Sequence, residues 1–208
     1  QNDAPVNSLP GTQNAQEDVP LSIGGIRVSD VDANRDPNAA DRNLSVTLSV
    51  LNGTLSLGVT VPGVTVTGTN TTTLTLTGNL ANLNTALASL RYLGNLNFNG
   101  TDTLTVVSND QGNYGDANGD GLPGTAGDAL TDTDTLQIIL AAVNDSPVAV
   151  DDTAIAVEAG GTNNSVNGVD PRGNLLVNDT DVDIATNADR SGLAKAFGGG
   201  LEHGFIGQ

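Results

Sequence analysis

Apolar and polar residues alternate along much of the first 145 residues of this chain. The clearest alternation runs over 44–50, and shorter ones occur at 20–23, 26–28, 54–57, 64–66, 73–77, 103–107 and 133–140. A period of two is typical of strands that bury one face. Many short strands at regular spacing favour an all-β fold, a Greek-key immunoglobulin-like or cadherin-like β-sandwich. Asn52-Gly53, between 44–50 and 54–57, predicts a two-residue hairpin turn.

One segment departs from this alternation. Leu80, Leu83, Leu87 and Leu90 recur at helical spacing. We therefore expect one short helix near residues 79–90, covering one end of the sandwich, with its leucines in the core.

An internal repeat divides the chain. Residues 2–6, Asn-Asp-Ala-Pro-Val, return at 144–148 as Asn-Asp-Ser-Pro-Val, and the Asp-Val-Asp of 30–32 returns at 181–183. Repeated linkers of this kind mark a complete module between two boundaries. The repeat predicts a complete β-sandwich at 1–145 and a truncated second module at 146–190, too short to bury two sheet faces. The glycine-rich stretch 191–208 is expected to be a flexible tail.

The net charge of the chain limits the kinds of partner that it can bind. The 208 residues carry 24 acidic and 7 basic side chains, for a formal net charge of −17, and no cysteine. Phosphate backbones and anionic membranes would repel such a chain, which argues against nucleic-acid partners and against direct membrane insertion. Of the acidic residues 21 are Asp, which prefers turns, so the negative charge is expected at strand ends, where it invites a hard cation.

Catalytic chemistry is poorly represented. The single histidine, His203, lies in the expected tail, and there is no Trp to line a sugar-binding cleft. Neither a Ser-His-Asp triad nor a thiol nucleophile can be assembled. The sequence therefore predicts a protein that is not an enzyme.

Several short motifs, taken in order, resemble the cadherin-like or immunoglobulin-like tandem repeats of large bacterial RTX-type surface adhesins. They are the two Asn-Asp-x-Pro-Val linkers, Glu-Asp-Val-Pro-Leu at 17–21, Ser-Asp-Val-Asp at 29–32, Phe-Asn-Gly-Thr-Asp at 98–102 and Leu-Thr-Asp-Thr-Asp at 130–134. Residues 146–183 resemble the start of a VCBS-type repeat. The resemblance implies a calcium-rigidified extracellular spacer that supports cell adhesion or biofilm attachment indirectly, with neighbouring repeats bridged by Ca²⁺ at the linkers.

Strand direction indicates which carboxylates can converge on calcium, because successive strands return to opposite ends of a sandwich. The expected top cluster is Asn2, Asp3, Asp30, Asp32 and Asp110. The expected bottom cluster is Glu17, Asp102, Asn144 and Asp145, joined by Asp181 and Asp183 across the module boundary. Carboxylate and carbonyl oxygens are the ligands that Ca²⁺ prefers.

A third candidate calcium site is a loop that begins Asp116-Ala117-Asn118-Gly119-Asp120-Gly121, like an EF-hand loop. The Leu122 carbonyl and Asp128 could complete it. Position twelve of the loop is Gly127 rather than Glu, so the usual bidentate ligand is missing or displaced.

Two other functions stay open at this stage. The open strand edges of 146–190 could pair with another copy, making a self-assembling extracellular filament or matrix. The module could also bind a glycan or protein through its loops, although its three aromatic residues, Tyr92, Phe98 and Tyr114, offer little contact surface.

Overall fold

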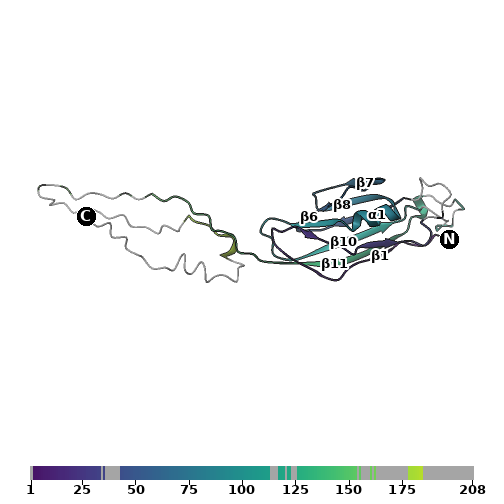
Figure 1. Ribbon diagram of the computed structural model, residues 1–208, viewed down its shortest axis with the longest axis horizontal. Helices are drawn as coiled ribbons and strands as arrows, with labels where there is room; N and C mark the ends of the chain where they lie inside the picture. Colours follow the sequence, from purple (N-terminus) through teal and green to yellow (C-terminus); the bar gives the residue numbers. More distant parts are fainter. Residues whose placement is uncertain are drawn as a thin grey trace. The chain divides into compact units, whose positions relative to one another are not determined.

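The computed structural model describes residues 2–33, 35, 43–112, 117–119, 121–122, 126–153, 155, 160, 162 and 178–184. The chain divides into two units, Gln1–Ala142 and Val143–Gln208. Figure 1 shows the strands and the helix of the first unit. The described part of the first unit is all-β apart from one α-helix and a 3₁₀ turn. The expected all-β class is confirmed at this level.

The largest sheet of the first unit has six strands in the order β2-β11-β10-β5-β8-β7. The pair β2–β11 is parallel and every other pair is antiparallel, so the sheet is mixed. Its members are β2 (Gln13–Gln16), β5 (Asn43–Ser49), β7 (Val64–Thr67), β8 (Thr73–Asn79), β10 (Gly100–Asn109) and β11 (Thr131–Ala141).

Two smaller sheets and the helix complete the first unit. One sheet has the order β3-β9-β6, and the other pairs β1 with β4. Their strands are β1 (Val6–Ser8), β3 (Leu21–Ser22), β4 (Arg27–Ser29), β6 (Gly53–Leu57) and β9 (Leu90–Gly94). The helix α1 (Leu80–Leu87) connects β8 to β9 and packs against β4 and β8.

One hydrophobic core joins these elements. The alternation over 44–50 buries Leu44, Val46 and Leu48 completely, and the leucine stripe buries Leu83 and Leu87. The strand β5 and the helix thus turn their apolar side chains toward this core, as their sequence periods predict.

Three details differ from the sequence prediction. The expected hairpin at Asn52-Gly53 is wrong, because β5 lies between β8 and β10 and has no free edge, while β6 pairs with β9 in another sheet. The helix is shorter than 79–90. Its last predicted leucine, Leu90, instead begins β9, a strand that the helical spacing concealed.

Little of the second unit is described. Val148 and Thr180 form an antiparallel bridge, and a 3₁₀ turn, Val182–Ile184, follows. The expected tail at 191–208 and most of 146–190 lie outside the described residues.

Candidate functional site

The start of the chain gathers the predicted top cluster at one end of the first unit. Asn2 donates from Nδ2 to Asp110 Oδ2 at 2.6 Å and to the Asp128 carbonyl at 2.9 Å. The next residue, Asp3, donates its backbone N–H to Asp32 Oδ2 at 3.1 Å. The loop after β4 and the loops around the 3₁₀ turn Ala126–Asp128 therefore both lie against the Asn2–Asp3 segment.

The loop after β4 is a tight acidic turn. Asp30 Oδ1 accepts the backbone N–H groups of Asp32 at 3.0 Å and Ala33 at 2.9 Å. Burial, and then the neighbouring Asp32 carboxyl, raise the pKa of Asp30 to about 6. Asp32 itself is fully buried. This turn therefore holds the fully buried Asp32 carboxyl group close to the partly buried Asp30 carboxyl group, an arrangement that costs free energy unless a cation or a proton is shared.

Asp110 and Asp128, both fully buried, organise the facing loops. Asp110 Oδ1 accepts N–H groups from Gly112 at 2.9 Å and Leu130 at 2.8 Å. Asp128 Oδ1 accepts those of Ala117 at 2.8 Å and Asn118 at 3.1 Å. Asp128, predicted as part of a separate EF-hand-like loop, thus also contacts the top cluster through its carbonyl. Asp116 and Asp120 of that loop lie outside the described residues, whereas Leu122 is described and exposed.

Three buried oxygens of this acidic end have no hydrogen-bond donor within the described part of the chain: Asn2 Oδ1, Asp30 Oδ2 and Asp32 Oδ1. Buried polar atoms are almost always satisfied, so three neighbouring exceptions need an explanation. Sequence reasoning placed these residues together but could not show which of their oxygens are free.

The opposite end of the first unit uses its acidic residues differently. Asp102 is buried and accepts N–H groups from Leu51 at 3.2 Å and Asn52 at 2.9 Å, and a hydroxyl from Tyr92 at 3.0 Å. Burial, followed by the bond to Asp102, raises the pKa of Tyr92 far above its usual value. Glu17, also buried, accepts from Asn99 Nδ2 at 3.1 Å. Sequence analysis did not predict that Tyr92 bonds to Asp102, because nothing in the sequence distinguishes a core tyrosine that has a buried polar partner from one that has none.

The second unit repeats the hydrogen bonds of the acidic turn. Asp183 donates its N–H to Asp181 Oδ1 at 2.9 Å, as Asp32 does to Asp30. Asp145 donates its N–H to Asp183 Oδ2 at 2.5 Å, as Asp3 does to Asp32. Asn144 precedes Asp145 as Asn2 precedes Asp3. The repeat seen in the sequence is therefore a repeat of local structure, whereas the predicted calcium site that would join it to Glu17 and Asp102 stays a prediction.

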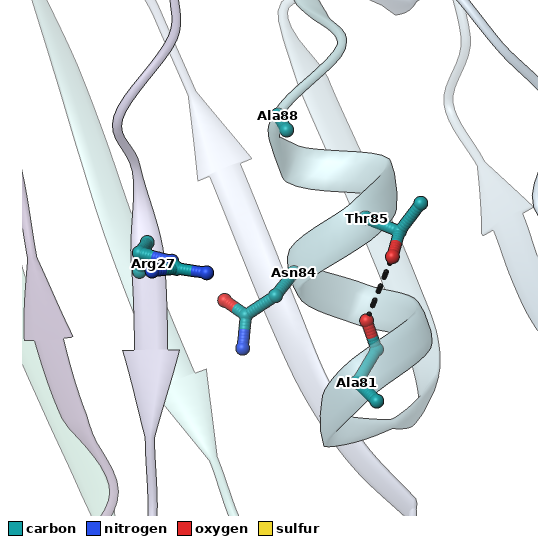
Figure 2. Close-up of a pocket in the computed structure, with 5 residues that line it drawn as sticks. All are labelled: Arg27, Ala81, Asn84, Thr85 and Ala88. Carbon is teal, nitrogen blue, oxygen red and sulfur yellow. Dashed lines mark hydrogen bonds between the residues drawn. The ribbon is translucent and has the colours of Figure 1, made fainter.

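A shallow groove of about 500 Å³ lies between β4 and α1 (Figure 2). Figure 2 shows Arg27 and Asn84 pointing toward one another across it. The side-chain amide of Asn84 is already hydrogen-bonded to the backbone of β4: it accepts from Val28 N and donates to Val28 O, both at 2.9 Å. The remaining lining, Ala81, Thr85 and Ala88, is small and offers few recognition groups.

Residues 37–118, less than half of the chain, match the family model described as Protein GAMETE EXPRESSED 2 domain. Among the described elements, the match includes the strands β5 to β10 and the helix α1. No curated protein matches the chain. No helix in the described part of the chain is long and apolar enough to cross a membrane.

This match corrects the family assignment made from short motifs. The similarity is to a domain of gamete-expressed proteins, so the identification as a bacterial RTX or VCBS adhesin repeat is wrong. The spacer function in an adhesin, its role in biofilm attachment, and the two alternatives of a self-assembling matrix subunit and a glycan- or protein-binding module are overturned with it. The motifs misled because acidic turns and Pro-containing linkers suit many all-β domains.

Proposed function

We propose that the chain is a non-catalytic structural domain of an extracellular or cell-surface protein expressed in gametes. The observation that carries this proposal is the match of 37–118 to the gamete-expressed domain, because it covers the central strands β5, β8 and β10 with the helix between them. The matched segment is therefore the scaffold rather than a single loop.

The use of the buried acidic groups supports a structural role. Asp102, Asp110 and Asp128 each accept backbone N–H groups from turns, so their negative charges fix loops. Hydrogen bonds from several N–H groups to a carboxylate are strong, so each of these side chains is used to hold a loop in place.

The fold suits such a role. We propose that the six-stranded sheet and the β3-β9-β6 sheet form the two layers of an immunoglobulin-like Greek-key sandwich. Both sheets contribute to the same core, for example through Val46 in β5 and Leu55 in β6. Sandwich domains of this class recur in cell-surface proteins, which is an argument from fold alone.

The test is to locate the protein on intact cells. An antibody raised against the full chain should label non-permeabilised gametes of the source organism and give much weaker labelling of vegetative or somatic cells. Labelling that appears only after permeabilisation would overturn the surface location, and equal labelling of all cell types would overturn the gamete assignment.

A further inference from the structure

We propose that the acidic end of the first unit binds one hard divalent cation, with Ca²⁺ the best match, through Asn2 Oδ1, Asp30 Oδ2 and Asp32 Oδ1. They are three of the six buried side-chain oxygens that lack a hydrogen-bond partner within the described residues; the other three are Asn7 Oδ1, Ser108 Oγ and Asn178 Oδ1. Asn2 is 3% exposed and Asp32 0%, so water does not reach them freely. An oxygen that gives up hydration on folding without gaining a donor costs free energy, unless a ligand takes the donor's place.

The orientation of the Asn2 amide is fixed by its neighbours. Both partners of Nδ2, the Asp110 carboxylate and the Asp128 carbonyl, are acceptors. Rotating the amide by half a turn would place oxygen against oxygen, so Oδ1 must be the atom without a partner. A neutral amide oxygen held in this way can only accept, and a cation is an acceptor's natural ligand.

In each of the two carboxylates, one oxygen accepts hydrogen bonds and the other has no partner. In Asp30, Oδ1 holds the turn while Oδ2 is unpartnered. In Asp32, Oδ2 accepts from Asp3 while Oδ1 is unpartnered. One oxygen of each carboxylate fixes the loop, and the other is left available to an ion.

The donor set selects the kind of ion. All three atoms are oxygens, and neither His nor Cys contributes, which is the chemistry of hard cations rather than of zinc or copper. Ca²⁺ accepts irregular sets of six to eight oxygens, whereas Mg²⁺ demands a near-ideal octahedron. Three oxygens from two separate loop segments suit the more tolerant ion, which would link the start of the chain to the loop after β4.

Two conservative variants of the full chain test the proposal. Asp30→Asn and Asp32→Asn each keep the oxygen that holds the loop and replace the unpartnered oxygen with an amide nitrogen. Asp134→Asn, an exposed change on β11 with the same loss of charge, is the matched control. Calcium affinity is measured by calorimetry, and amide NMR shifts of Asp3, Asp32 and Ala33 report binding at this end rather than elsewhere.

We expect calcium to shift those amide signals in the wild-type chain and in the control, and either site variant to weaken this binding by about tenfold or more. Without calcium the site variants should unfold at the same or a higher temperature than wild type, because repulsion is removed. A purely structural role predicts a lower temperature. Unmoved amide signals, or site variants that bind like the control, would overturn the cation site while leaving the proposed surface location intact.

Discussion

The hydroxyl oxygen of Tyr92 lies 3.0 Å from Asp102 Oδ2, in a bond that connects the two larger sheets of the first unit. Tyr92 belongs to β9 and Asp102 to β10, and these strands are in different sheets. The same hydroxyl lies 3.1 Å from the Asn52 carbonyl, and Asp102 accepts the Asn52 N–H at 2.9 Å. The turn between β5 and β6 is thereby held to both sheets.

Replacing Tyr92 with Phe should lower the free energy of unfolding by about 1–3 kcal/mol. The ring would still fill its place in the core, but Asp102 would lose a donor in a site that water does not reach. Denaturant unfolding measures the loss. Thr85→Ala removes an exposed hydroxyl that bonds to Ala81 O, and should change stability by less than about 0.5 kcal/mol. Equal effects of the two variants would mean that the Tyr92 hydroxyl contributes nothing special.

Tyr92 should also make the fold sensitive to high pH. Its pKa is raised in the folded state, chiefly by burial and then by Asp102, so folding favours the protonated phenol. The stability that it contributes is complete below the unfolded pKa near 10 and is lost as the pH rises through the higher folded value. An absorbance titration near 295 nm should therefore show one tyrosine that ionises only as the chain unfolds. In Tyr92→Phe that late step should be absent, and its persistence would assign it to the other tyrosine.

How far the sequence predicts this fold depends on how local each signal is. The alternation over 44–50 predicts β5 correctly, because the burial of one face of a strand produces a pattern within that strand alone. The pairing of β5 depends on β8 and β10, which are distant in sequence, so the local Asn52-Gly53 signal gave the wrong partner. Leu90 lies at helical spacing from the leucines before it, but it belongs to β9. It is apolar because it is buried in the same core as the helix.

The candidate site also has a part that the sequence predicts and a part that it does not. Alternating strand direction correctly brings Asp3, Asp32 and Asp110 to one end, because that depends only on the order of the strands. Which oxygen of each carboxylate is used by a backbone N–H depends on loop geometry at the scale of one bond. The same reasoning placed Asp102 in a second calcium cluster, which stays a prediction; the sequence did not reveal that Asp102 accepts hydrogen bonds from Tyr92 and from the turn before β6.

Gly53, at the start of β6, has no room for a side chain. A Cβ there would lie 2.6 Å from the Leu93 carbonyl oxygen and would overlap the ring of Tyr92. Backbone of the paired strand cannot move away without breaking the sheet, so Gly53→Ala should cost about 1–3 kcal/mol or more in stability. Gly24→Ala is the control, since a Cβ at Gly24 meets nothing within 4 Å. Thermal unfolding of both variants should give a lowered midpoint for Gly53→Ala only, and a normal midpoint there would contradict this packing.

Asn79 connects the largest sheet to α1 and sets where the helix begins. Its Oδ1 accepts the N–H of Asn82 at 3.0 Å, and the residue itself has extended backbone angles, as an N-cap requires. Asn79→Ala removes that acceptor and should destabilise the chain by about 1 kcal/mol, whereas Asn79→Asp keeps it and adds a charge that the helix N-terminus favours. Asp matches the native Asn in size and Ala does not, so denaturant unfolding of Asn79→Asp tests the cap without a change in side-chain volume. If Asn79→Asp lost as much stability as Asn79→Ala, the site would depend on the Asn79 amide nitrogen, and the cap would not be what fixes the start of α1.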